Sequence, residues 1–224
     1  MFICFEGKYL AEQVPRALEF YAMLSGLVKD QPGLILQTPF LSIDKDNAQV
    51  LYVKLDREEH LHAWKNNHVH LGIQYEGRNK MFVDYRLRIG SEVLDSGKAP
   101  FGDISTSAGK HLLLWQYPKP SNEKDDEDSG LADAAPHAPP FVWQNLVDSA
   151  TYVSETHILR ISSWPNKHIG LAVKNSISRI DGDGLYLIRM ERDYGKYERE
   201  EAPTDAARCQ EAAANDDQVG LGKC

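Results

Sequence analysis

The chain has 224 residues, enough for one large domain or two small ones of about 100 residues each. Hydrophobic residues make up 42% and charged residues 26%, so the chain can form a hydrophobic core. The net charge is -8 with no long basic run, which argues against a nucleic-acid partner, because phosphates are bound by clustered lysine and arginine. The apolar stretches are strand-sized, the N-terminus does not resemble a signal peptide, and three cysteines do not form a disulfide framework. We therefore expect a cytoplasmic protein without a membrane partner.

The first half of the chain predicts alternating strands and helices. Apolar side chains recur at helical spacing between Val14 and Lys29, with Pro15 in the first turn. A second helix carries Leu61 and Trp64, with Asp56 as its expected N-cap. In chain order the predicted elements are strand 2–5, helix 14–29, strands 34–43 and 50–55, a helix from residue 56, and strand 82–93. This order is that of the ferredoxin-like unit.

The second half repeats part of this order. Residues 51–60 align without gaps to residues 159–168. In the same way, residues 2–5 align to 111–114, and 85–89 to 186–190. Identities are few, so the repeat is inferred from pattern and order. We predict an α+β fold of two ferredoxin-like units, the second of which is degenerate.

The predicted units differ in what connects their strands. The first unit covers residues 1–108 and the second residues 109–200. An acidic, Ala/Pro-rich linker, residues 118–140, is inserted into the second unit, which has lost its first helix unless residues 141–148 replace it. Residues 201–224 are predicted to be a disordered tail.

A series of residues in the first half carries a family resemblance. The pair Ala63-Trp64 is followed by His70 and Gln74, and then come Gly77-Arg78 and the strand Tyr85-Arg-Leu-Arg. This series, within about the first 95 residues, resembles the antibiotic-biosynthesis monooxygenases. The resemblance implies a dimeric α+β barrel, in which two ferredoxin-like units pair their sheets. A two-unit chain would form it as a pseudo-dimeric monomer, as tandem members do, some of them in fungal secondary metabolism; a homodimer is the alternative.

The resemblance also implies a reaction. Family members include cofactor-free oxygenases that act on anthrone-like polyketides, haem degraders and proteins of unknown role. We expect a cofactor-independent monooxygenase whose partners are molecular oxygen and an apolar small molecule: a polyketide, a terpenoid or an oxylipin. Such chemistry needs a base, hydrogen bonds to a developing oxyanion and exclusion of water, and no metal or flavin motif is visible. The alternatives are a non-catalytic binding protein and a haem-degrading oxygenase. The first strand lacks the Asn that haem degraders of this fold use.

The candidate site residues follow from the helix and the closing strand. Trp64 is either a core residue or a pocket wall that donates through its indole N–H. A histidine suits a general base, and His70 occupies the family's position, whereas His60 and His68 are better placed on the Trp64 face of a continuous helix. The predicted catalytic residues are Trp64, His70, His68 and Tyr85, and the predicted substrate-binding residues are His60, Arg86 and Arg88.

Two further expectations limit the site. Tyr85 and the two arginines alternate along one strand, so they must lie on opposite faces of the sheet. In the second copy, Ala172 stands at the position of Trp64 and Ser178 at that of His70. We therefore expect one site per chain, in the first unit.

Overall fold

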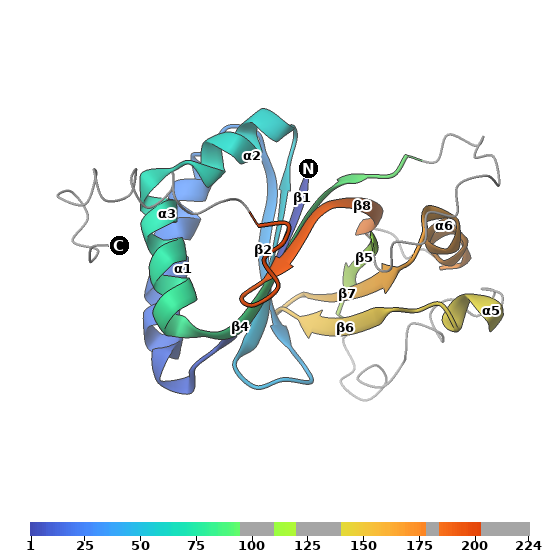
Figure 1. Ribbon diagram of the computed structural model, residues 1–224, viewed down its shortest axis with the longest axis horizontal. Helices are drawn as coiled ribbons and strands as arrows, with labels where there is room; N and C mark the ends of the chain where they lie inside the picture. Colours follow the sequence, from blue (N-terminus) through green and yellow to red (C-terminus); the bar gives the residue numbers. More distant parts are fainter. Residues whose placement is uncertain (95–109, 120–139, 178–183, 203–224) are drawn as a thin grey trace. The chain divides into compact units, whose positions relative to one another are not determined.

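The computed structural model describes residues 1–94, 110–119, 140–177 and 184–202 (Figure 1). The chain divides into two compact units. The first unit consists of Met1–Pro39, Asp46–Ile89 and Arg192–Cys224, and the second of Phe40–Lys45 and Gly90–Glu191. The predicted linker, apart from its ends, and the predicted tail from residue 203 lie outside the described residues.

Most elements of the first unit lie between β1 and β4. Its elements are β1 (Phe2–Tyr9), a short turn (Ala11–Gln13), α1 (Val14–Lys29), β2 (Leu34–Ser42), β3 (Ala48–Leu55), α2 (Glu58–Lys65), α3 (His68–Glu76), a π-helical turn (Gly77–Met81) and β4 (Phe82–Glu92). The predicted helix over residues 14–29 is confirmed, and β1 extends four residues beyond the predicted strand. Figure 1 shows α1, α2 and α3 together on one side of these strands.

The helix predicted to run on from residue 56 is two helices. Lys65 is the last residue of α2, and α3 begins at His68. The Asn67 side chain accepts hydrogen bonds from the backbone N–H groups of Val69 and His70, at 3.0 and 3.2 Å, and so caps the start of α3. Asp56 is not the N-cap of α2, because Arg57 holds that position and the Asp56 carboxylate contacts the His60 ring instead.

Within the described residues, the elements of the second unit are β5 (His111–Pro118), α5 (Pro140–Trp143), β6 (Asp148–Val153), β7 (His157–Trp164), α6 (Lys167–Ser176) and β8 (Gly184–Gly195). The prediction that this unit has lost its first helix falls on residues that the structure does not describe, apart from the four-residue α5.

The strands are hydrogen-bonded in the order β1-β3-β2-β6-β7-β5-β8-β4, which closes on itself as a barrel. The strand order is the same in the two halves of the barrel: β4-β1-β3-β2 in the first and β8-β5-β7-β6 in the second. The pairs β1–β3, β5–β7 and β6–β7 are antiparallel. The α+β barrel class is therefore confirmed, whereas the origin of the second unit as a degenerate copy stays a prediction.

The predicted alignment of the two halves is wrong by one residue. α2 begins at Glu58 and α6 at Lys167, so the offset is 109 residues, whereas the alignment of residues 51–60 with 159–168 assumed 108. Leu51 and Val53 pack on the side of α2 in the first unit. On β7, Ile158 and Trp164 pack on the side of α6, so Leu159 and Ile161, the predicted partners of Leu51 and Val53, face away from the helices. A slip of one residue moves every side chain of a strand to the other face. The counterpart of Trp64 is therefore Val173 instead of Ala172, and that of His70 lies outside the described residues.

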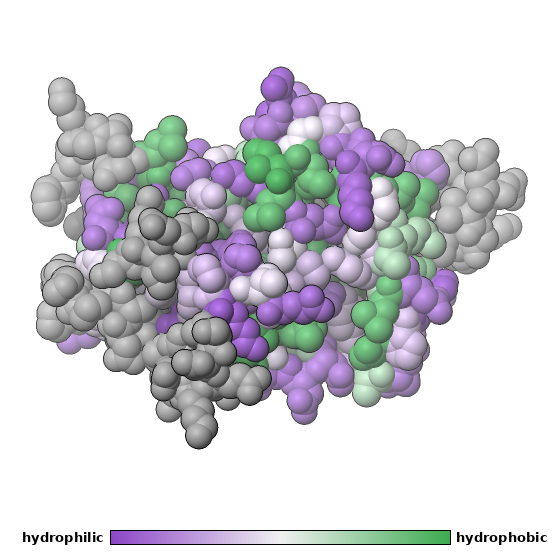
Figure 2. Space-filling model, turned by 180° about the vertical axis from the view of Figure 1, so that it is seen from behind, coloured by the Kyte–Doolittle hydropathy of each residue, from purple (hydrophilic) through white to green (hydrophobic). Residues whose placement is uncertain are grey.

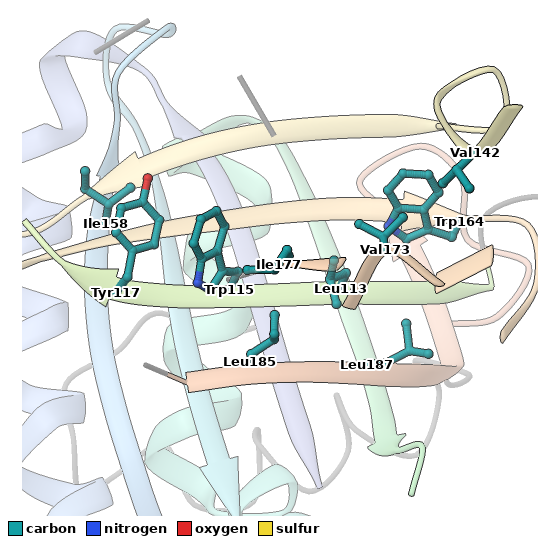
Figure 3. Packing of buried hydrophobic residues seen from close by; sticks show 10 residues of the cluster. All are labelled: Leu113, Trp115, Tyr117, Val142, Ile158, Trp164, Val173, Ile177, Leu185 and Leu187. Carbon is teal, nitrogen blue, oxygen red and sulfur yellow. The ribbon is translucent and has the colours of Figure 1, made fainter. Parts of the chain in front are cut away.

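The second unit has one continuous core on its helix side. Figure 3 shows side chains from β5, β7 and β8 packed with Val142 and Val173 of the helices. Its buried members are Leu113, Trp115, Tyr117, Val142, Ile158, Trp164, Val173, Ile177, Leu185 and Leu187. In the part of the first unit that the structure describes, smaller clusters lie around Ile3 and Leu61 and around Phe20 and Ile73.

Apolar side chains also reach the surface. In the view of Figure 2, hydrophobic residues form separate areas divided by hydrophilic ones. Large apolar side chains that are exposed include Leu18, Ile35 and Leu41. Among the described helices, none has both the length and the apolar character that crossing a membrane requires.

Candidate functional site

Trp64 and His70 form a stacked pair in the first unit. Trp64 lies in the last turn of α2 and is 8% exposed, and His70 lies in the first turn of α3. The ring centroids are 4.2 Å apart and the ring planes differ by 21°. The chain between the two helices turns at Asn67, whose cap hydrogen bonds fix the start of α3. The helix break therefore brings the two rings together.

Hydrogen bonds fix the protonation pattern of His70. Its Nδ1 lies 3.0 Å from the carbonyl oxygen of Trp64, and because a carbonyl only accepts, Nδ1 carries the proton and donates. The Nε2 atom of the neutral ring then holds a lone pair, and the Gln74 amide nitrogen, 3.1 Å away, donates to it. Nε2 is thus the basic atom of this ring.

The predicted placement of His68 on the Trp64 face is wrong, whereas His60, four residues before Trp64 within α2, keeps the predicted spacing. The helical spacing that joined Leu61, Trp64 and His68 assumed a continuous helix, and the break at Asn67 puts His70 on Trp64 instead. His68 is half-buried at the start of α3. His60 Nδ1 lies 2.6 Å from Asp56 Oδ1, and this hydrogen bond is the main cause that lowers the pKa of Asp56.

Tyr85 lies on the helix side of the sheet among aromatic rings. Its ring centroid is 5.8 Å from that of Phe5 and 5.8 Å from that of Phe82. The Tyr85 hydroxyl oxygen accepts a hydrogen bond from Arg199 Nη1 at 2.8 Å. Tyr9 stacks on Phe82 at 4.7 Å, and burial raises the pKa of Tyr9 to about 12. Phe5, Phe82, Tyr85 and Tyr9 make a second aromatic group, separate in its contacts from the Trp64–His70 pair.

The two arginines of β4 are engaged by acidic residues. Arg86 donates twice to Asp193, at 2.8 and 2.6 Å. The Arg88 side chain is 1% exposed and forms an ion pair with Glu6 of β1. Arg88 lies on the sheet face opposite the helices, because its neighbours Leu87 and Ile89 pack on the helix side. The prediction that Tyr85 and the arginines face opposite ways agrees with this placement.

Cys4 lies on the same helix-free face as Glu6 and Arg88. Burial is the largest effect on this thiol and raises its pKa to about 12, while the positive charge of Arg88 lowers the pKa and the negative charge of Glu6 raises it. Cys4 is therefore a protonated thiol at neutral pH.

Of the predicted site residues, the structure brings Trp64 and His70 together and gives the others separate surroundings. Sequence reasoning missed Glu6 and Cys4, although a charged residue within the apolar strand FICFEGKY is a signal of a buried ion pair. It also gave no role to Gln74, whose spacing of four residues from His70 places both on one helix face. Across the described part of the chain, no three His, Cys, Asp or Glu residues come together in a group that could hold a metal.

Comparison with known proteins gives likenesses in structure only. No protein-family model matches the sequence. No curated protein matches it either. An anthrone oxidase-like protein is similar over 91% of this chain and 96% of its own, with 12% identity and a TM-score of 0.30. A candidate monooxygenase from Lactobacillus acidophilus NCFM covers 86% of this chain and 94% of its own, with 9% identity and a TM-score of 0.36. A chlorite dismutase mutant from Candidatus Nitrospira defluvii covers 84% and 90%, with 10% identity and a TM-score of 0.30. Identities and TM-scores this low transfer no activity to the chain.

Proposed function

We propose that the chain is a cofactor-independent monooxygenase with its site at Trp64 and His70 of the first unit. The substrate is an apolar, enolisable small molecule of secondary metabolism, such as a polyketide, a terpenoid or an oxylipin. The observation that carries the proposal is the orientation of the His70 ring. Its Nδ1–H donates to the Trp64 carbonyl, so the basic atom is Nε2, which accepts from the Gln74 amide. The sequence resemblance to the antibiotic-biosynthesis monooxygenases supplies the reaction class.

The reaction balances without a cofactor. His70 Nε2 takes a proton from a CH₂ group of the substrate when the substrate replaces Gln74 at that atom. The resulting carbanion gives one electron to O₂, and the two radicals combine at that carbon to form a peroxide anion. This anion takes the proton back from His70 and becomes a hydroperoxide. Loss of water from the hydroperoxide leaves a ketone, so one CH₂ group and one O₂ yield one C=O group and one water.

The surroundings of His70 suit this step. Stacking on Trp64 holds the imidazole plane, which spares the reorganisation that a freely rotating base needs. Among the described residues, the Trp64 indole N–H has no hydrogen-bond acceptor, so it is available to the oxyanion of the substrate.

Oxygen uptake with a matched pair of variants tests the proposal. The substrate is anthrone, and the protein is treated with a chelator and freed of flavin. We expect His70→Gln to lower kcat/KM by roughly 10²- to 10⁴-fold, the usual contribution of a positioned base. His62→Gln is the control, because His62 is a neighbouring histidine at the surface beside Glu58 and contacts neither ring. Activity that needs added flavin or iron, or equal activity of the two variants, would contradict the proposal.

The rival function is a non-catalytic carrier of the same kind of ligand. It is favoured by the contacts of His60, Arg86 and Arg88, each of which is engaged by a carboxylate of the protein. Tight binding of anthrone-like compounds without oxygen uptake would support the carrier. A Soret band on titration with haem would instead support the haem-degrading alternative.

A further inference from the structure

Four basic side chains gather where α6 begins in the second unit. His111, the first residue of β5, lies directly opposite Arg189 of β8. On its other side His111 lies opposite Trp164, the last residue of β7, and α6 begins soon after with Lys167 and His168. Residues directly opposite in a ladder point to the same face of the sheet. The strands and the first turn of α6 thus bring these four side chains to one place.

This face is the one that α6 covers. Leu187 lies two residues before Arg189 on β8, so both point to the same side. A Cβ atom added to Gly170 of α6 would lie 2.6 Å from the Leu187 side chain, which shows how closely the helix packs there. His111 and Arg189 therefore project toward the helix that carries Lys167 and His168.

The charges of the cluster act on one another. Burial is the main cause that lowers the pKa of His111, and the positive charges of Arg189, Lys167 and His168 lower it further. Like charges this close destabilise the fold. The acidic residue next to this group on β8 is Glu191, whose carboxylate accepts a hydrogen bond from Ser91 at 2.5 Å. Among the described residues, neither Lys167 nor Arg189 has a carboxylate within ion-pair distance.

We infer that this cluster, His111, Lys167, His168 and Arg189, binds a phosphate- or sulfate-type oxyanion, free or carried by a small molecule. The chain has more acidic than basic residues, with a net charge of -8. An overall excess of basic residues therefore does not explain why these four lie together. An oxyanion accepts charge-assisted hydrogen bonds from several donors at once and removes their mutual repulsion. This site is independent of the proposed oxygenase site, which lies in the first unit.

The end of α6 adds to the attraction. The positive end of the dipole of this ten-residue helix points toward the cluster. The Asn166 side chain already accepts from the backbone N–H groups of His168 and Ile169, so the side chains of the cluster, and not these two amides, bind the oxyanion. Recognition therefore depends on Lys167 and Arg189, which can be replaced without loss of the cap.

Binding of the oxyanion is linked to protons. The negative charge raises the pKa of His111, so the bound form takes up a proton as the pH falls. The charged groups that act on His111 are Arg189 from β8 and Lys167 and His168 from α6. Sulfate does not titrate between pH 5.5 and 8, so an affinity for sulfate that rises as the pH falls in this range reports on His111.

The test is a titration of the full chain with sodium sulfate, with sodium chloride at matched ionic strength as the reference. We expect saturable binding by calorimetry and a rise in Tm with sulfate. Lys167→Gln and Arg189→Gln should each weaken binding about tenfold, the effect of losing one charge-assisted hydrogen bond. Lys174→Gln is the control, because it removes the same charge in the last turn of α6, away from the cluster.

Further arms of the experiment make the outcome decisive. Circular dichroism in chloride establishes that each variant is folded. Inorganic phosphate and phenyl phosphate are then compared, and tighter binding of the ester identifies a phosphorylated small molecule as the ligand, whereas equal binding identifies the free anion. Absence of saturable sulfate binding by the wild-type chain, or an equal loss in Lys174→Gln and Lys167→Gln, would overturn the inference.

Discussion

The two units bury different chemistry on corresponding faces of their sheets. On the helix-free face of the first unit lie Cys4, Glu6 and Arg88, whereas the helix-free face of the second carries Leu112 and Leu114 on β5. On the helix side, the described part of the first unit has two small clusters beside the Trp64–His70 pair. In the second unit, the described residues form one larger hydrophobic cluster there (Figure 3), and their one buried arginine on this side, Arg160, lies over the rings of Trp115 and Tyr117. A continuous apolar core contributes stability, whereas buried ionisable groups cost free energy unless they are paired. The difference therefore predicts that the second unit stabilises the chain and the first carries its chemistry.

Two tryptophans give the largest test of this comparison. Trp164 is fully buried, stacks edge-on against Trp143 at 6.0 Å, and donates through Nε1 to Ser162 Oγ at 2.9 Å. We expect Trp164→Ala to lower the free energy of unfolding by about 3–5 kcal/mol. Trp64→Phe keeps an aromatic ring against His70 but removes the indole N–H together with part of the ring, so it should lower stability less than Trp164→Ala does and should lower oxygenase activity. Urea unfolding and oxygen uptake on the same samples measure both effects. A larger stability loss for Trp64→Phe than for Trp164→Ala would reverse the assignment of the two units.

The regular elements could be predicted from the sequence because their signals are local. The apolar spacing from Val14 to Lys29 and the strands before and after it depend on neighbours within a few residues. The break between α2 and α3 was missed because Leu61, Trp64, His68 and Leu71 keep a helical period across it. The available signal was Asn67, a residue type that caps helices, but capping depends on backbone geometry that the pattern does not show.

Two other features depend on contacts between distant residues. Glu6 and Arg88 are 82 positions apart in the sequence, so the residues near one of them do not indicate that it pairs with the other. The alignment of the two halves was wrong by one residue because strands repeat every two residues, and a few matching apolar residues do not distinguish neighbouring registers. The candidate site was predicted in part: Trp64 and His70 came from the family resemblance, and their contact came from the helix break.

The Arg88–Glu6 ion pair gives the next largest effect. Replacing Arg88 with Met removes the guanidinium that faces a mostly buried carboxylate, and such single replacements cost about 3 kcal/mol or more. The double variant Glu6→Gln, Arg88→Met should recover most of the loss, because it makes this face more like the apolar face of the second unit. Denaturant unfolding of the two single variants and the double variant provides the measurement. If the losses in the single variants simply add, the two side chains do not interact, and the first unit does not depend on this pair.

The smallest effect is the pH dependence that Cys4 of the first unit gives the chain above pH 9. The pKa of Cys4 is raised by burial from 9.0 to about 12, so above pH 9 the unfolded chain loses the thiol proton while the folded chain keeps it. The folded state then binds more protons than the unfolded state, and stability falls as the pH rises; the contribution is complete below pH 9 and is lost toward pH 12. Between pH 8 and pH 10 this lowers the free energy of unfolding by about 1.4 kcal/mol for one thiol.

Cys4→Ala should flatten the curve of unfolding free energy against pH over this range. Leu114→Ala, the matched change on the same face of the second unit, should lower stability equally at both pH values and leave the slope unchanged, because no ionisable group is removed. Urea unfolding at pH 8, 9 and 10 separates the two outcomes. An unchanged slope in Cys4→Ala would show that the thiol is not held protonated by the fold, and the contrast between the helix-free faces of the two units would then rest on Glu6 and Arg88 alone.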